Sequence, residues 1–96
     1  MVSGQCSKAL LFCGTGVGIS MAANKVKGIR CAHCADTLEA QLCRQHNNAN
    51  VIVLPARFIT NDQAVEFVEE FLATDFEGGR HQRRIEKIPV KACSRQ

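Results

Sequence analysis

A cysteine followed by a glycine-rich loop is the stretch of this sequence best suited to chemistry. An apolar run at residues 10–12 leads into Cys13, and Gly14, Gly16 and Gly18 follow within five residues. Glycines at this density let the backbone turn tightly and approach a ligand closely. If a helix follows, its unpaired N–H groups and the positive end of its dipole face the same place and favour an anion. Reactive cysteines are typical of such positive ends, so the stretch predicts an anion site beside a usable thiolate.

Two other interpretations of this loop stay open at this point. Many α/β proteins use a glycine-rich turn only to connect a strand tightly to a helix. A dinucleotide site is the other alternative, because Gly14, Gly16 and an acidic residue about 20 positions on, Asp36, roughly match its fingerprint. However, Ile19 occupies the third glycine position, and Asp36 lies several residues past the end of the second predicted strand.

The composition limits the class of protein. With 96 residues the chain forms one small domain at most, and its 46% hydrophobic and 22% charged residues are ordinary for a globular protein. No apolar run approaches the roughly 20 residues that span a bilayer, and the first four residues do not begin a signal peptide. We therefore expect a cytoplasmic protein whose six cysteines are reduced. A net charge of +3 without Trp or Tyr argues against a nucleic-acid partner.

The order of the elements predicts a parallel sheet covered by helices. Apolar runs predict strands over residues 9–13, 29–34 and 50–54, the last ended by Pro55. Helices are predicted over residues 17–26 and 36–44, and after the cap Thr60-Asn61-Asp62. The buried face of that third helix is predicted to contain Val65, Val68, Phe71 and Leu72. Residues 78–88 predict a basic helix or an extended arm. Strands that alternate with helices indicate βαβ units, whose ligands bind beyond the carboxyl ends of the strands.

A zinc site is the chief rival to the glycine loop. Cys31, Cys34, Cys43 and His46 have the types and spacing of four tetrahedral ligands. If residues 31–34 form a strand, however, Cys31 and Cys34 point to opposite faces and cannot both reach one metal ion. We therefore expect these cysteines to be small buried side chains.

Two polar segments remain to be explained. His46-Asn47-Asn48-Ala49-Asn50 leads into a buried strand at the amino edge of the sheet, and such residues also form ordinary turns. Arg80 and Arg84 are four residues apart, so a helix would place both on one face as a bidentate clamp for phosphate. A solvated charged face is the alternative for these arginines.

Taken together, three motifs resemble the type B ribose-5-phosphate isomerase family, which also includes galactose-6-phosphate isomerases. They are Cys-Gly-Thr-Gly-Val-Gly-Ile-Ser from Cys13, His-Asn-Asn-Ala-Asn from His46, and Glu-Gly-Gly-Arg-His-x-Arg-Arg-Ile from Glu77. The resemblance covers residues 5–88 and leaves residues 89–96 as a tail. It implies a Rossmann-like α/β/α domain with a parallel sheet, and an isomerase that needs no metal and no cofactor. The implied reaction interconverts ribose 5-phosphate and ribulose 5-phosphate in the pentose phosphate pathway, through an enediolate.

The same resemblance implies the roles of individual residues. Cys13 would move the proton between C1 and C2, assisted by Thr15, and His46 would open the sugar ring. Backbone N–H groups of the loop would stabilise the enediolate. His46 and Asn47 would reach into a partner subunit's site, so a homodimer or higher oligomer with shared sites is implied. The residues implied to bind substrate are Gly14, Gly16, Gly18, Ser20, Asn47, Arg57, Arg80 and Arg84, with Arg57 serving the partner.

Members of this family begin with two further strand-helix units, and their first strand ends in an Asp-His pair. At about 30 residues a unit, roughly 60 residues of that pattern have no counterpart here, so we expect a partial domain. Its first strand, with Leu10, Leu11 and Phe12, would then be an apolar edge. A non-catalytic remnant that binds a phosphosugar or pairs with a full-length subunit is the alternative function. Galactose 6-phosphate and allose 6-phosphate are the alternative substrates.

Overall fold

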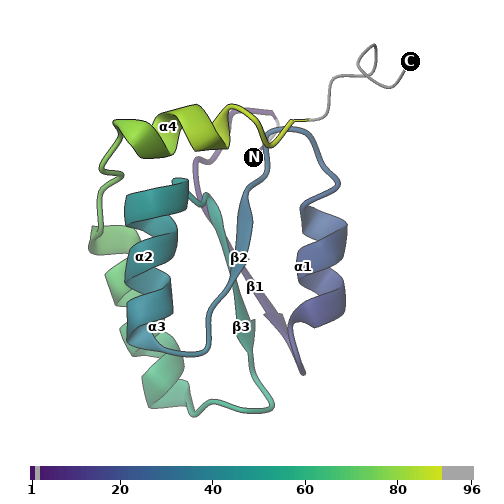
Figure 1. The fold of residues 1–96 in the computed structure, drawn as a ribbon. Helices are drawn as coiled ribbons and strands as arrows, with labels where there is room; N and C mark the ends of the chain where they lie inside the picture. Colours follow the sequence, from purple (N-terminus) through teal and green to yellow (C-terminus); the bar gives the residue numbers. More distant parts are fainter. Residues whose placement is uncertain (2, 90–96) are drawn as a thin grey trace.

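The computed structural model describes residue 1 and residues 3–89, and these form strands that alternate with helices (Figure 1). The elements in chain order are β1 (Ala9–Cys13), α1 (Val17–Ala23), β2 (Cys31–His33), α2 (Thr37–Asn47), β3 (Val51–Pro55), α3 (Asn61–Ala73) and α4 (Arg80–Ile85). Every predicted strand and helix is therefore present. The basic segment is a short helix, α4, and Pro89 is the last described residue.

The sheet is parallel and has β3 at its centre. Its order is β1-β3-β2, with Ala9 opposite Val51, and Cys31 opposite Val51 on the other side. All five residues of β3 are buried, as expected for a β-branched strand covered on both faces. Helix α1 covers one face, α2 and α3 cover the other, and α4 crosses the end of α2 (Figure 1). The predicted Rossmann-like parallel α/β fold is confirmed.

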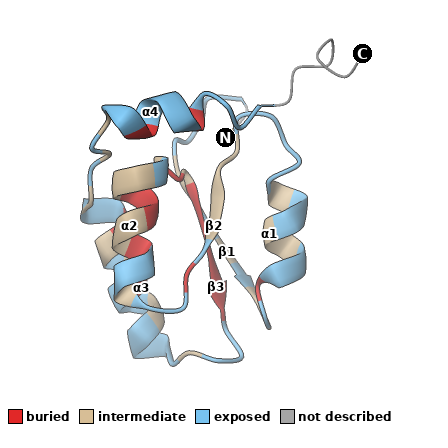
Figure 2. Cartoon of the chain, viewed as in Figure 1, coloured by how far each residue is buried: buried red, intermediate tan, exposed pale blue. Residues whose placement is uncertain are grey.

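The main core lies between β3 and the helix pair α2 and α3 (Figure 2). Phe67 and Phe71, four residues apart on α3, are 3% and 0% exposed. The predicted face of α3 is therefore partly wrong, because Val65 and Leu72 are each 57% exposed. Two phenylalanines bury more area than valine and leucine, so they decide which side of the helix turns toward β3.

Side chains at the helix ends explain where these elements begin and end. Asp36 caps α2 by accepting a hydrogen bond from the backbone N–H of Glu39, and Asn48, in the left-handed conformation, ends it. Helix α2 thus runs one turn beyond its predicted end at Arg44, so His46 lies in its last turn. Thr60 and Gln63 form a capping box at the start of α3, which confirms the predicted cap.

Strand β1 is an edge of the sheet in the part of the chain that the structure describes. Leu10 is 40% and Phe12 is 57% exposed, while Leu11 is half-buried. Phe12 also lines a shallow, almost wholly apolar groove with Ala64, Val65 and Val68 of α3. The predicted apolar edge is therefore confirmed for the outward side chains of this strand.

Candidate active site

The glycine loop lies between the end of β1 and the start of α1. Gly16 is the N-cap of α1 and has a φ of 81°, a conformation that side chains other than glycine rarely adopt. A Cβ atom at this position would lie 2.7 Å from Cδ2 of His33 and 2.9 Å from Cγ1 of Val53. The loop is thus pressed against β2 and β3, and only glycine fits at its centre.

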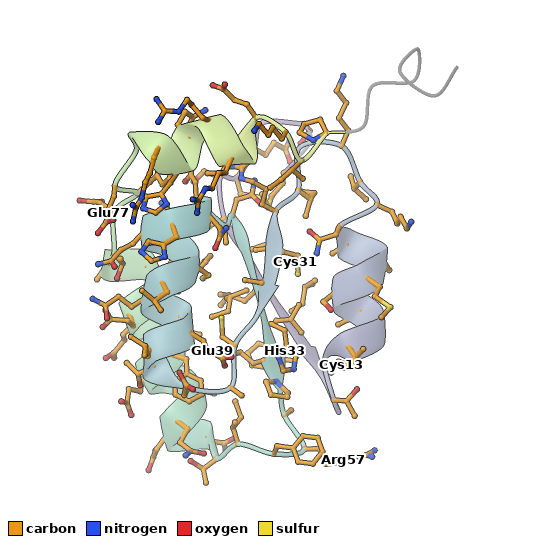
Figure 3. All side chains as sticks on the ribbon, viewed as in Figure 1. Cys13, Cys31, His33, Glu39, Arg57 and Glu77 are labelled. Carbon is orange, nitrogen blue, oxygen red and sulfur yellow. The ribbon has the colours of Figure 1, made fainter. Side chains whose placement is uncertain are left out.

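Cys13 is the last residue of β1 and lies beside the segment that follows β3. The carbonyl of Cys13 accepts a hydrogen bond from the N–H of Ala56, and the carbonyl of Gly14 accepts one from the N–H of Arg57. The guanidinium of Arg57 passes over Gly14, where an added Cβ would lie 3.4 Å from Nη2 (Figure 3). A half-buried thiol, a glycine loop and an exposed cation therefore meet at the carboxyl edge of one chain.

The hydroxyl residues of the loop are held by its own backbone. The hydroxyl of Ser20 donates to the carbonyl of Val17 over 2.7 Å. Oγ1 of Thr15 accepts from the N–H of Val17 over 3.4 Å. Thr15 is exposed beside Cys13, whereas the hydroxyl of Ser20 is directed back into the first turn of α1.

His33 is a site residue that the sequence reasoning missed. Its Nε2 lies 2.8 Å from the carbonyl oxygen of Thr15, so that ring nitrogen carries the hydrogen and donates a hydrogen bond to the loop. Figure 3 shows His33 at the end of β2, near Cys13. A polar side chain at the carboxyl end of a strand, next to a predicted loop site, is the signal that could have identified it.

A second cluster of polar side chains joins the end of α2 to the start of α4. Nε2 of His81 lies 3.5 Å from Oε1 of Glu77, and Nε2 of His46 lies 4.0 Å from the same oxygen. The two imidazole rings stack, with centroids 4.4 Å apart. Burial lowers the pKa of His81, with smaller contributions from His46 and Arg80, while Glu77 opposes the shift.

The two groups of predicted site residues lie at opposite ends of the sheet. Helix α2 runs antiparallel to the strands and α4 crosses its end (Figure 1), so His46 and Asn47 of α2 and the exposed Arg80 and Arg84 of α4 lie at the amino edge. A strand of five residues is about 16 Å long. Within one chain, therefore, His46 and the arginines of α4 do not reach a small ligand bound at Cys13.

The zinc tetrad that the cysteine spacing suggested is not formed among the described residues. Sγ of Cys34 lies 3.9 Å from Sγ of Cys43, but His46 lies with Glu77 and His81 instead. Cys34 donates a hydrogen bond to Cys43. This bond, followed by burial, raises the pKa of Cys34. The same bond lowers the pKa of Cys43, against the opposing effect of burial. Cys34 and Cys43 are buried, as predicted, but the prediction is wrong for Cys31, which is half-buried because β2 is an edge strand. The five described cysteines are free.

The structure also gives Asp36, the acidic residue of the dinucleotide interpretation, a different role. The carboxylate of Asp36 accepts the N–H of Glu39 at 2.8 Å as the cap of α2. Its role in the fold is therefore explained without a ribose.

Within the described residues, no helix has the length and apolar character needed to cross a membrane.

These features define an α/β protein with a cysteine and a glycine loop at the carboxyl edge of a parallel sheet. Comparison with known families identifies it further: a family described as Ribose/Galactose Isomerase matches residues 1–88, so the chain belongs to this family. The predicted family resemblance is thereby confirmed.

Individual relatives agree with this assignment. The chain is 56% identical over 79 residues to a probable ribose-5-phosphate isomerase B of Mycoplasma genitalium, covering 82% of this chain and 52% of the relative. It is 46% identical over 88 residues to ribose-5-phosphate isomerase B of Escherichia coli, covering 92% and 59%. A crystal structure of the Mycoplasma genitalium enzyme with bound ribulose-5-phosphate superposes with a TM-score of 0.86 at 50% identity, covering 91% and 57%. The chain thus spans little more than half the length of these relatives.

Proposed function

We propose that this chain takes part in the aldose-ketose isomerisation of a sugar phosphate, ribose 5-phosphate to ribulose 5-phosphate. The observation that carries the proposal is the placement of Cys13 against the glycine loop, with Arg57 over Gly14. The proposal includes a cytoplasmic location and a role in the pentose phosphate pathway. It requires neither a metal nor a cofactor.

The geometry supports a proton-transfer mechanism. Sγ of Cys13 removes the proton from C2 of the open-chain aldose and returns it to C1, which leaves the carbonyl at C2. Between the two steps the substrate is an enediolate, and backbone N–H groups of residues 14–20, other than those of Val17 and Ser20, which already donate within the chain, stabilise its negative charge. Thr15, which is exposed two residues after Cys13, assists the movement of protons between the two oxygens. A positioned base contributes about 10²- to 10⁴-fold to such a rate.

The complete site requires two chains. His46 as the ring-opening residue, Asn47 beside it, and Arg80 and Arg84 as the phosphate clamp all lie at the amino edge, about a strand length from Cys13. A homodimer that apposes the amino edge of one subunit and the carboxyl edge of the other brings both groups to one substrate. Arg57 lies at its own loop, from which it can contact a phosphate there or at a neighbouring subunit's site.

The names of the relatives support ribose 5-phosphate as substrate. Two of them are named ribose-5-phosphate isomerase B, and the Mycoplasma genitalium structure holds ribulose-5-phosphate. Galactose 6-phosphate and allose 6-phosphate stay as alternatives, because the family description includes galactose isomerases. A panel of the three sugar phosphates, compared by kcat/KM, distinguishes them.

A mixing experiment tests both the reaction and the sharing of sites. Cys13→Ala and His46→Ala chains are prepared separately, and each is expected to be inactive with ribose 5-phosphate. Mixed dimers contain one intact site, built from Cys13 of one chain and His46 of the other, so mixing is expected to restore part of the wild-type turnover. Two active single variants, or a mixture as inactive as its components beside an active wild type, would overturn the shared site.

A non-catalytic remnant is the second candidate, favoured by the span of little more than half of each relative. It predicts that the wild-type chain binds ribose 5-phosphate, seen by calorimetry, without converting it. That result would overturn the proposed catalysis by this chain.

A further inference from the structure

We propose that His46, Glu77 and His81 form a binding site for a divalent transition-metal ion. Among the described residues, this is the group whose imidazole nitrogens and carboxylate oxygen all lie within 4.8 Å of one another. The family resemblance assigns no metal to this place, so the inference goes beyond the proposed function. Two imidazoles and one carboxylate leave open coordination positions, and this donor set suits Zn²⁺, Co²⁺ or Ni²⁺ better than Mg²⁺ or Ca²⁺.

The backbone already holds the three donors in place. His46 lies in the last turn of α2, which the left-handed Asn48 ends. The N–H of Glu77 donates to the carbonyl of Gln45 over 3.1 Å, so the segment before α4 is tied to that turn. His81 is only 8% exposed in the first turn of α4. Little backbone ordering is left to oppose binding.

The side chains need a small movement to reach coordination geometry. Donors around a tetrahedral zinc ion with bonds of about 2.0 to 2.1 Å lie roughly 3.4 Å apart. His81 and Glu77 are already at 3.5 Å, whereas His46 and Glu77 are at 4.0 Å and must close by about half an ångström. The ligand nitrogens of His46 and His81 lie within 4.8 Å of each other and must close by up to about 1.4 Å. The stacked rings must also splay so that their lone pairs converge. The side chains of His46 and Glu77 are 42% and 50% exposed, which leaves them room to turn.

The charges near the cluster act in both directions. The carboxylate of Glu77 attracts a cation, and burial favours the neutral imidazole of His81, the form that binds metals. Arg80 and Arg84 of α4 add positive charge nearby and weaken the attraction. We therefore expect weaker binding than in a closed structural zinc site.

The position of the site predicts its effect on the proposed reaction. This step rests on the proposed function, in which His46 opens the sugar ring. A metal ion bound to the ring nitrogen of His46 removes the acid-base group, so the cation would inhibit isomerisation. The site would then be an inhibitory metal site, and the proposed reaction itself uses no metal.

Cobalt binding to the 96-residue chain tests the site without any activity measurement. Co²⁺ is titrated at neutral pH while the imidazole resonances are followed by NMR. The resonances of His46 and His81 are expected to broaden, and those of His33, at the other end of the sheet, to stay sharp. Equal broadening of all three, no broadening, or thiolate-to-cobalt charge-transfer absorption from the cysteines would overturn the proposal.

Two isosteric variants complete the test. Glu77→Gln removes a ligand from a half-exposed side chain, so the fold is expected to persist while cobalt affinity falls on the order of tenfold or more. Glu86→Gln removes an exposed carboxylate at the far end of α4, and its cobalt affinity is expected to equal that of the wild type. Equal affinities for both variants would refute the site.

Discussion

Gly16→Ala is the substitution whose cost can be worked out most directly from the structure. The left-handed φ of 81° costs an alanine about 1 to 2 kcal/mol. Its Cβ would also lie 2.7 Å from Cδ2 of His33 and 2.9 Å from Cγ1 of the fully buried Val53, and such overpacking costs about 1 to 3 kcal/mol. Because alanine also reduces the entropy of the unfolded chain slightly, we expect a net loss of about 2 to 4 kcal/mol.

Urea unfolding followed by circular dichroism measures this loss, at several protein concentrations so that association is separated from folding. Gly18→Ala is the matched control, because Gly18 lies in α1 with nothing within 4 Å of an added Cβ. It is expected to leave the free energy of unfolding unchanged or to raise it by up to about 1 kcal/mol. If Gly16→Ala fails to fold, adding His33→Ala removes one of the two contacts and is expected to restore part of the stability. Equal stability of the two alanine variants would refute the assigned loop geometry.

Three further predictions concern the core, the cysteines and the edge of the sheet. Arg44→Met removes a buried guanidinium that donates to the carbonyls of Thr74 and Ala49, and is expected to cost about 2 to 4 kcal/mol in urea unfolding; a loss below about 0.5 kcal/mol would contradict this. Iodoacetamide should modify the exposed Cys6 faster than the buried Cys34 and Cys43, and unfolding in urea should abolish the difference. Equal modification rates in the folded protein would show that Cys34 and Cys43 are not buried. Phe12→Lys should lower association measured by light scattering, because Phe12 is 57% exposed on the edge strand; unchanged size would show that this edge does not mediate association.

The sequence predicted the elements well where local chemistry decides them. Thr60 and Asp36 cap helices through their own side chains. The β-branched run of β3 is typical of a strand that is buried on both faces of a parallel sheet. The face of α3 was harder to predict, because Val65 and Leu72 are as apolar as a core residue needs to be. Only the packing of Phe71 against β3 and α2 shows which side of the helix is inside.

The residues of the candidate site also differ in whether a local sequence pattern reveals them. Cys13 and Gly16 were found from the sequence because glycine spacing after a strand carries a backbone signal. His33 was missed because its bond to the carbonyl of Thr15 joins residues 18 apart, across two strands of the sheet. Glu77 and His81 reach His46 only through the path of the chain between α3 and α4, which no local pattern specifies.

The topology itself separates the proposed site residues of one chain into two groups. In a parallel sheet each loop from strand to helix opens at the carboxyl edge, so the loop after β1 and the segment after β3 meet there. Each return from helix to strand opens at the amino edge, which gathers the end of α2 and, through its contacts with α2, helix α4. The proposed reaction needs a base from the first edge and a phosphate clamp from the second. A twofold pairing that joins the carboxyl edge of each subunit to the amino edge of the other satisfies this need twice, with two equal sites. Restored turnover in the mixture of Cys13→Ala and His46→Ala chains is the direct consequence of that arrangement, since a site within one chain could not be rebuilt by mixing.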